Sequence, residues 1–461
     1  MSKFSVISPI DGKEALSVNY STDEQIQQAL EAARNAQVSW RGLSLAERKA
    51  FVSKAIDWLV EHKDDVARSI TTCIGRPISQ SPGEVRGLEE RARYMIDVAE
   101  HALADIVPAP KEGFKRYLRR EPLGTVMIIA PWNYPFLTAV NAIVPALVAG
   151  NTVLLKHASQ TPLAAELFQK AFDAAGLPAG VFQTLYMTHS ATERVLRSDY
   201  VDFVAFTGSV EGGKRIQSTI SERFIGAGLE LGGKDPAYVR ADADVNFAAE
   251  NLVDGSFFNS GQSCCGVERI YVHASIFDAF VAKFVEVTKQ YKLGDPTNPS
   301  VNLGPMVSAA AAATVKAQIE DAVAKGAKKL IDESLFPAHA EGTAYHAPQV
   351  LINVNHSMAV MTEESFGPVV GIMAVADDEE AIRMMNDSQY GLTASIWTKD
   401  QAAAEAIGAQ VATGTVFMNR CDYLDPALAW TGVKDTGRGI SLSELGYHQL
   451  TRVKSYHLRN A

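Results

Sequence analysis

Between residues 115 and 220 the chain alternates short apolar runs with amphipathic segments, and this alternation restricts the possible folds more than any other feature. Four runs are typical of strands that enter a buried sheet, at 115–131, 151–156, 180–186 and 201–208. Residues 161–176 and 209–220 have helical periodicity instead, and Pro162 begins the first of these helices while Gly176 ends it. Strands and helices in regular turn predict a parallel, doubly wound α/β sheet.

The rest of the chain extends this pattern in both directions. Residues 22–40 and 45–70 are expected to form amphipathic helices, with Thr22 as the N-cap of the first. After about residue 235 a second series of strands and helices follows, and an alanine-rich helix is expected at 308–326. A length of 461 residues favours two to three domains. We therefore expect a first half built to hold a nucleotide and a second α/β unit after it.

Charge and cysteine usage exclude several classes of function. The formal net charge is −10, from 43 basic and 53 acidic residues, and no basic tract is present, so nucleic acid is not expected as a partner. No apolar stretch is long enough to cross a bilayer and no signal sequence follows Lys3, so we expect no membrane association and a cytoplasmic protein. The four cysteines show no CxxC spacing and no nearby histidine cluster, so neither disulfides nor a metal site is predicted.

The segment "FTGSVEGG" (206–213) is a candidate phosphate-binding turn. An apolar strand runs into Gly208 and Ser209, and a helix begins there, so free backbone N–H groups and the helix dipole point at an anion. Gly208 and Gly213 allow close approach of backbone and helix. The segment is not a GxGxxG motif, and taken alone it fits an ordinary strand-to-helix turn equally well.

Three further polar residues follow apolar segments. Asn133 in "IIAPWNYP" stands where a side-chain amide can donate a hydrogen bond to an oxyanion. Glu230 in "LELGGKDP" stands among leucines, and such apolar surroundings raise the pKa of a carboxyl group toward the range of a general base. The segment "NSGQSCC" offers a thiol among backbone N–H donors. Each has a plainer reading when taken alone. Asn133 also fits a helix N-cap, Glu230 a satisfied buried carboxylate, and the cysteine an inert core residue.

In the order Asn, Glu, Cys, with the glycine turn between the first two, these elements resemble the aldehyde dehydrogenase family. The resemblance covers nearly the whole chain, through "PWNYP", "LLKHASQTP", "FTGSVEGG", "LELGGKDP", "FFNSGQSCCGVERI", "LGPM", "EESFGPVV", "NDSQYGLTASIWTKD" and "GTVFMN". It implies the α/β fold of that family, with a Rossmann-like cofactor domain (1–107 and 123–234), a catalytic domain (235–434) and a small bridging β element (108–122 and 435–461). The bridging element carries an exposed edge, so a homodimer or homotetramer is expected.

The resemblance also assigns catalytic roles. The family's nucleophile lies two residues after a glutamine, which here is Cys264 after Gln262. Cys264 is expected to attack the aldehyde, Asn133 and the Cys264 N–H to stabilise the oxyanion, and Glu230 to activate the water that hydrolyses the thioester. The cofactor accepts the hydride. Cys265 is expected to line the pocket or pack; its oxidation with Cys264 is disfavoured because vicinal disulfides are strained.

The expected cofactor is NAD or NADP. Positions that match the family's cofactor contacts are Trp132, Lys156, Gly208, Ser209, Gly213, Leu231, Glu364 and Phe366. Ser159 stands where NAD-strict members tend to carry a ribose-binding glutamate, so repulsion of a 2′-phosphate is removed and NADP should be accepted. His157 and Gln160 also depart from the usual motif, which leaves the preference between the two cofactors open.

The substrate is a small-molecule aldehyde whose identity the motifs leave open among small to medium aliphatic aldehydes, semialdehydes and aromatic aldehydes. One type of succinate-semialdehyde enzyme carries an arginine where this chain has Asn141, so that carboxylate clamp is missing. Arg420 in the later loop is an equal candidate for a substrate carboxylate or for pairing with Asp422 or Asp425. The expected pocket residues are Tyr134, Asn141, Ser263, Cys265, Arg420 and Trp430.

Two other functions are compatible with parts of this motif set. A CoA-acylating relative uses the same cysteine but needs no hydrolytic base, so Glu230 favours the free-acid product. A non-catalytic nucleotide-binding protein of the same fold would be expected to lack Cys264, Glu230 or Asn133, and the chain keeps all three.

Overall fold

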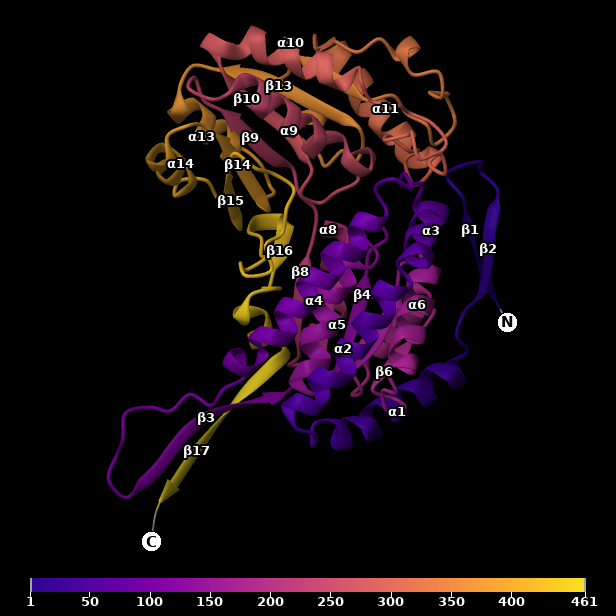
Figure 1. Cartoon of the computed structure of the whole chain (residues 1–461), viewed down its shortest axis with the longest axis vertical. Helices are drawn as coiled ribbons and strands as arrows, with labels where there is room; N and C mark the ends of the chain where they lie inside the picture. The colour runs from indigo at the N-terminus through magenta and orange to yellow at the C-terminus, as the bar shows by residue number, and fades with distance from the viewer. Residues whose placement is uncertain (1, 460–461) are drawn as a thin grey trace.

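The computed structural model describes residues 2–459 and shows two sheet-centred lobes, one above the other in Figure 1, with a long two-stranded ribbon that projects from the lower one. The lower lobe of that view contains the first half of the chain. Its sheet has the strand order β16-β8-β7-β4-β5-β6, parallel throughout except for β16. The bounds are β4 (Thr125–Ala130), β5 (Thr152–His157), β6 (Phe182–Thr184), β7 (Phe203–Thr207), β8 (Gly226–Glu230) and β16 (Gly437–Arg438).

Helices cover both faces of this sheet, as the alternating sequence predicted. Alternate residues of β4 point into two separate cores: Val126, Ile128 and Ala130 join the core with α2 to α6, while Met127 and Ile129 join the core with α1, α7 and α8. The helices are α1 (Asp23–Trp40), α2 (Leu45–Glu61), α3 (Lys63–Ile74), α4 (Pro82–Ala102), α5 (Leu137–Ala149), α6 (Pro162–Ala174), α7 (His189–Arg197) and α8 (Val210–Thr219).

The expected helix at 45–70 is two helices. The backbone leaves helical geometry at His62 (φ −99°, ψ 25°), which separates α2 from α3. The His62 ring stacks on Trp58, and its Nδ1 lies 2.8 Å from the Trp58 carbonyl oxygen. That side-chain contact stabilises the break by engaging a carbonyl at the end of α2. Thr22 is the N-cap of α1 as expected, in a capping box with Gln25.

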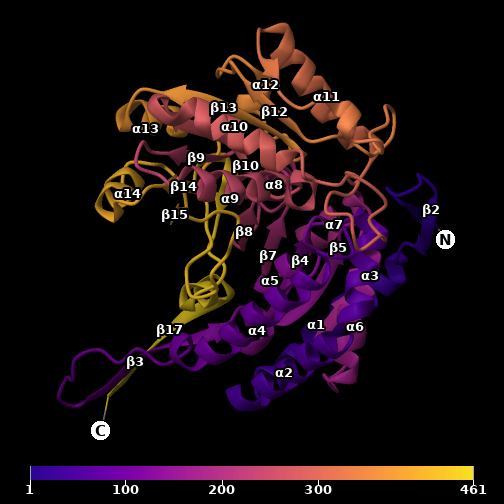
Figure 2. The same ribbon diagram turned by 45° about the horizontal axis from the view of Figure 1, so that its top comes forward.

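The second lobe contains a seven-stranded sheet of order β11-β12-β13-β10-β9-β14-β15, parallel except at β11. Figure 2 shows its helices packed over the sheet. The strands are β9 (Asp235–Val239), β10 (Val267–His273), β11 (Lys328–Lys329), β12 (Gln349–Ile352), β13 (Val369–Val375), β14 (Thr393–Trp397) and β15 (Thr415–Met418). The helices are α9 (Val245–Phe257), α10 (Phe277–Thr288), α11 (Ala309–Ala324), α12 (Ala359–Thr362), α13 (Asp378–Asn386) and α14 (Gln401–Gly408).

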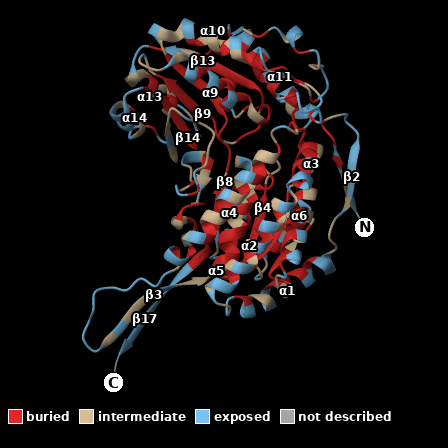
Figure 3. Ribbon diagram, viewed as in Figure 1, coloured by how far each residue is buried: buried red, intermediate tan, exposed pale blue. Residues whose placement is uncertain are grey.

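Two antiparallel two-stranded ribbons lie outside the two large sheets, and the one formed by β3 and β17 joins segments far apart in the chain. β1 (Lys3–Ile7) pairs with β2 (Glu14–Asn19), and β3 (Phe114–Pro122) pairs along its whole length with β17 (Thr451–Arg459). Figure 3 shows buried residues concentrated in the two large sheets and the inner faces of the helices, and half-buried and exposed ones along the β3–β17 ribbon. We expected residues 435–461 to belong to the bridging element. β16 lies in this range but hydrogen-bonds to β8, and so it belongs to the first sheet.

Candidate active site

A cleft of about 540 Å³ opens at the carboxyl ends of the parallel strands β4, β5, β7 and β8. Carboxyl ends of a doubly wound sheet are where such folds bind nucleotides. Seven of the expected cofactor residues line this cleft: Trp132, Lys156, Gly208, Ser209, Leu231, Glu364 and Phe366. Asn133 and Cys264 also line it, which brings two of the expected catalytic residues to its inner end.

The cleft has the donor groups that a dinucleotide phosphate needs. Ser209 is the N-cap of α8, and its hydroxyl accepts a hydrogen bond from the Gly212 N–H at 3.1 Å, so the start of the helix faces the cleft. Lys156 lies at the same cleft, and burial lowers the pKa of its ammonium group. Arg215 of α8 also lines it, in an ion pair with Glu193. These groups fit NAD or NADP.

Two expected cofactor positions lie outside the cleft lining. Gly213 is on α8 beneath it, where an added Cβ would lie 2.6 Å from Leu231 side-chain atoms, so the residue permits close packing of helix and loop. Ser159 is exposed and is absent from the cleft wall, where Ala158 stands instead. The carboxylate that a ribose-binding acid would supply is therefore missing at this edge.

A second cavity of about 410 Å³ meets the cleft at Cys264 and Thr207, which line both. Its walls come from α4, the start of α5 and the loop after β15. Five of the six expected pocket residues line it: Tyr134, Asn141, Ser263, Cys265 and Trp430. Arg420 does not. Its guanidinium is exposed and stacks 3.5 Å from the centre of the Tyr423 ring.

The turn before Cys264 has an unusual backbone that presents the thiol. Asn259, Ser260 and Gly261 all have positive φ, at 53°, 57° and 70°. Side chains at such angles are uncommon, and runs of them mark functional sites. Gly233 approaches the Cys264 carbonyl so closely that a Cβ would lie 2.1 Å from its oxygen. Two glycine-containing loops therefore place the sulfur between the two cavities.

Asn133 is held by groups from two other segments, the turn before Cys264 and the segment between α3 and α4. Its side-chain amide donates to the Gln262 carbonyl at 3.2 Å, and the Asn259 amide donates to the Asn133 carbonyl at 3.3 Å. Arg76 donates to the same carbonyl and, through Nε at 3.0 Å, to Asn259 Oδ1. Arg76 also forms a buried ion pair with Glu84. The network fixes Asn133 beside the Cys264 turn, which is the placement that an oxyanion donor needs.

Glu230 ends β8 and lines the second cavity. Its carboxylate accepts hydrogen bonds from Thr207 at 3.2 Å and from Ser441. Burial raises the pKa of Glu230, while these hydrogen bonds and the charge of Arg91 oppose the rise. A carboxylate with a raised pKa at a cavity is suited to accept a proton near neutral pH.

Cys265 is buried, whereas its neighbour Cys264 is only partly buried. Cys265 is 4% exposed, and its thiol donates to Asp422 Oδ1 at 2.9 Å. A hydrogen bond to Cys264 and burial hold the pKa of Cys265 well above its usual value, and burial raises the pKa of Asp422 to about 6. Cys265 is therefore a neutral hydrogen-bond donor at the cavity wall.

Glu364 lies at the cofactor cleft and accepts a hydrogen bond from the Gly233 N–H at 2.9 Å. Burial, followed by repulsion from Glu268, raises the pKa of Glu364 to about 7. Glu268 itself is tied to Lys234 in a buried ion pair and accepts hydrogen bonds from the Ser365 and Phe366 N–H groups. The loop that contains Glu364 is thus anchored to β10.

Sequence reasoning missed the charged residues that helices bring to the two cavities. Arg76 and Glu84 precede or begin α4, Arg91 lies within it, and Arg215 lies in α8. Their segments have the periodicity of ordinary amphipathic helices, so no local signal separates them from surface arginines and glutamates. Only the tertiary packing shows that Arg76, Glu84 and Arg91 are buried and that the more exposed Arg215 borders the cleft.

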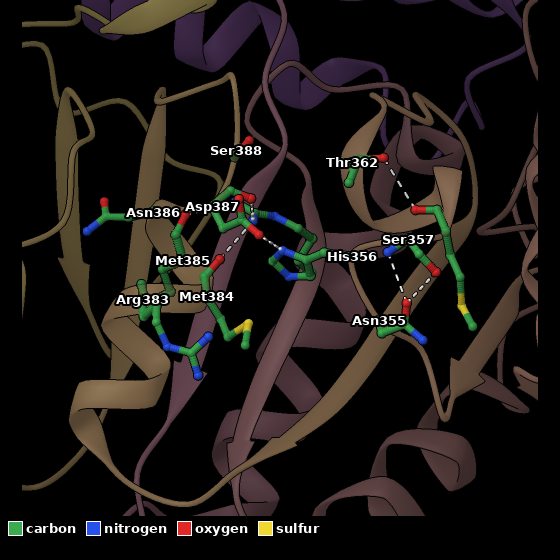
Figure 4. Close-up of polar contacts among 12 residues, drawn as sticks. Asn355, His356, Ser357, Thr362, Arg383, Met384, Met385, Asn386, Asp387 and Ser388 are labelled. Carbon is green, nitrogen blue, oxygen red and sulfur yellow. Dashed lines mark hydrogen bonds and ion pairs between the residues drawn. The ribbon is translucent and has the colours of Figure 1, made fainter.

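A separate polar cluster lies in the second lobe, at the end of α13 (Figure 4). His356 Nδ1 lies 2.6 Å from Asp387 Oδ2, and its Nε2 lies 2.9 Å from the Tyr271 hydroxyl. Arg269 joins the cluster to the Lys234 carbonyl and to carbonyls at the end of α13. None of these four side chains lines either cavity, so the cluster fastens α13 to the sheet.

Among residues 2–459 no group of three or more histidine, cysteine or acidic side chains is arranged to hold a metal ion. No helix in the same range is long and apolar enough to cross a membrane. The doubly wound sheet, the cation-bearing cleft at its carboxyl edge and a second cavity that meets it at a cysteine define a dinucleotide-dependent oxidoreductase.

The family model described as "Aldehyde dehydrogenase family" matches residues 1–456, and the chain belongs to this family. It is an enzyme that oxidises an aldehyde with NAD or NADP. The resemblance noted in the sequence and the expected fold are therefore confirmed.

Individual relatives are similar over almost the whole chain. The chain is 35% identical to "Succinate-semialdehyde dehydrogenase [NADP(+)]" of Mycolicibacterium paratuberculosis over 97% of this chain and 95% of that protein. It matches the crystal structure of succinic semialdehyde dehydrogenase from Streptococcus pyogenes in complex with NADP+ at a TM-score of 0.94, with 30% identity, over 99% of this chain and 100% of that one. It matches NADP-dependent glyceraldehyde-3-phosphate dehydrogenase from Bacillus halodurans complexed with NADP at a TM-score of 0.94 and 32% identity, over 100% and 96%.

Proposed function

We propose that the enzyme oxidises an aldehyde to the free carboxylic acid through a thioester on Cys264. The observation that carries this proposal is that Cys264 lines both cavities. An aldehyde in the second cavity and a nicotinamide in the cleft would then meet at its sulfur. This arrangement gives the carbonyl carbon a nucleophile on one side and a hydride acceptor on the other.

Cys264, Asn133 and Glu230 have separate roles in this reaction. The Cys264 thiolate forms a C–S bond to the carbonyl carbon, and the oxyanion of this thiohemiacetal accepts hydrogen bonds from the Asn133 amide and the Cys264 N–H. A nicotinamide cofactor held by Trp132, Lys156, Ser209 and Glu364 would supply the hydride acceptor, and loss of hydride from the thiohemiacetal would leave a thioester on Cys264. Glu230 takes a proton from the water that attacks the thioester, and the C–S bond breaks to release the acid. Its raised pKa supports this role.

We propose NADP as the preferred cofactor. Lys156 and Arg215 line the cleft, Arg215 in an ion pair with Glu193, and the exposed Ser159 adds no negative charge to repel a 2′-phosphate. The relatives from M. paratuberculosis and S. pyogenes are named or shown with NADP, which supports the same preference.

A semialdehyde, an aldehyde with a carboxylate at its other end, is the substrate class that we propose. Support comes from the two relatives named as succinate-semialdehyde dehydrogenases. We also propose that the enzyme works as a homodimer or homotetramer, because β3 and β17 form an extended two-stranded ribbon in which the outer edge of β17 pairs with no further strand among the described residues.

Initial rates of reduced-nicotinamide formation test the proposal. We expect activity with NADP, no increase on addition of CoA, and one acid formed per NADP reduced. A rate that depends on CoA would instead assign the enzyme to the acylating type, and a purified protein that turns over neither aliphatic, aromatic nor carboxylated aldehydes would refute the proposal.

A further inference from the structure

Arg91 is a buried cation in the wall of the second cavity. It lies in α4, its residue is only 6% exposed, and it lines the same cavity as Cys264 and Glu230. An arginine stays protonated in such a place because its intrinsic pKa is so high. The chain therefore keeps a permanent positive charge within the space that admits the aldehyde.

This charge has no acidic partner. Within residues 2–459 no carboxylate oxygen lies within 4 Å of the Arg91 guanidinium, whereas the neighbouring Arg76 is paired with Glu84. Arg91 Nη1 donates to the Leu137 carbonyl at 3.1 Å and to Asn141 Oδ1 at 3.4 Å, and the described residues offer no partner to its Nε and Nη2. A buried charge without a counter-ion is costly, so a site that retains one has a use for it.

The two carboxylates whose charges act on Arg91, Glu230 and Glu84, are already engaged by other groups. Glu84 is held by Arg76 and accepts hydrogen bonds from the Phe136 and Leu137 N–H groups at 2.7 and 3.1 Å. Glu230 is held by Thr207 and Ser441. Neither forms an ion pair with Arg91, so an anion that enters the cavity would meet an unpaired guanidinium.

A second unpartnered donor lies beside it. Asn141 of α5 is 3% exposed and lines the same cavity, and its Nδ2 is buried without any hydrogen-bond partner among the described residues. Because its Oδ1 accepts from Arg91, the amide and the guanidinium are held next to each other. Orphaned buried donors are rare, and this one lies beside a guanidinium without a carboxylate partner, so the two groups together indicate a missing acceptor.

We propose that Arg91 and Asn141 bind the terminal carboxylate of an aliphatic aldehyde whose carbonyl lies at Cys264. The inference rests on the proposed aldehyde oxidation and names the residues that select its substrate. A carboxylate accepts from the free guanidinium donors and from the Asn141 amide at the same time. The cation thus comes from α4, although Asn141 occupies the α5 position at which an arginine was sought in the sequence. A cavity of about 410 Å³ suits a short chain between the two ends.

Matched substrates and one variant test this site. The rates of wild type and Arg91→Gln are compared with 4-oxobutanoate, with its neutral isostere 4-oxobutanamide and with butanal. We expect R91Q to lower kcat/KM for 4-oxobutanoate by about tenfold or more, mainly through KM, and to change the two neutral substrates by less than about threefold. Arg93→Gln is the matched control, because Arg93 lies on the same helix but pairs with Asp57 and Glu89 outside the cavity, and it should change none of the three rates.

Other outcomes would overturn the inference. An equal fall for charged and neutral substrates would assign Arg91 to the support of Glu230, and no fall for 4-oxobutanoate would remove it from binding. If R91Q does not fold, the wild type still decides: succinate should compete with butanal at a concentration about tenfold lower than succinamide does, and equal inhibition would refute the site. If wild type oxidises no aldehyde at all, the proposed function fails instead.

Discussion

Two adjacent cysteines in this active site have opposite environments. Cys264 lines both cavities, whereas Cys265 is buried and donates its S–H to Asp422. A thiol whose pKa is held well above the usual value is a poor nucleophile at neutral pH. The sequence shows two similar sulfurs, and the contacts assign them different tasks.

Substitution of each cysteine tests this division. Cys264→Ala should lower kcat by about a thousandfold or more, because the bond-forming group is lost. Cys265→Ser should stay within a few-fold of wild type, since a hydroxyl also donates to Asp422. Steady-state rates decide, and a C265S rate as low as that of C264A would show that our assignment is wrong.

Glu364 gives stability a pH dependence of its own. Below about pH 4.5 its carboxyl is protonated in the folded and the unfolded chain alike. As pH rises from about 4.5 to about 7 the unfolded chain ionises first, so the folded state loses stability, and the whole penalty is present above about pH 7. Glu364→Gln removes this penalty.

We therefore expect E364Q without cofactor to melt at a higher temperature than wild type at pH 8 and at the same temperature near pH 4, below the pKa of the unfolded carboxyl. Thermal melts across this range measure the difference. A gap in melting temperature that is constant with pH would contradict the raised pKa of Glu364.

At the scale of elements, α4 connects the fold to the site. Glu84 in its first turn accepts hydrogen bonds from the N–H groups at the start of α5 and pairs with Arg76, which in turn holds Asn133. Both members of the ion pair have side chains at most 1% exposed. Removal of one partner leaves the other charge buried and unpaired.

Glu84→Gln should therefore destabilise the protein by about 3 kcal/mol or more. Glu89→Gln on the same helix breaks only a half-exposed pair with Arg93 and should cost less than about 1 kcal/mol. Denaturant titration of the two variants compares them. Equal losses of stability would mean that the Arg76–Glu84 pair does not anchor α5.

The elements also show what sequence reasoning can and cannot reach. Strands β4, β5 and β7 and helices α6 and α8 were predictable, because apolar runs and Pro or Gly boundaries mark them locally. The break at His62 was not, because it depends on a ring contact with Trp58. Arg91 was missed for a similar reason: an arginine in an amphipathic helix has the same local pattern whether it faces water or a cavity.

At the scale of the whole molecule, the two lobes supply different halves of the site. The first sheet brings Glu230 and the cofactor cleft, and the loop between α9 and β10 brings Cys264. The β3–β17 ribbon lies outside both lobes (Figure 1), and its Val453 and Leu458 are 55% and 47% exposed. Such an edge is available for pairing with a second copy of the chain.

Removal of residues 451–461 should therefore dissociate the oligomer into monomers. Light scattering after size exclusion is expected to give a multiple of 49.8 kDa for the full chain and a single-chain mass for the truncated one. A full-length protein that is already monomeric would contradict the proposal that β3 and β17 pair with a second copy of the chain.

The most direct test of the central claim is mass spectrometry of Glu230→Gln after mixing with NADP and 4-oxobutanoate. Without the base that activates water, the thioester should accumulate, and the acyl mass should appear on the peptide that contains Cys264 and should vanish in the double variant E230Q/C264A. An acyl group on Cys265, or NADPH formed in a first turnover with no acyl adduct on any cysteine, would contradict the mechanism that we propose.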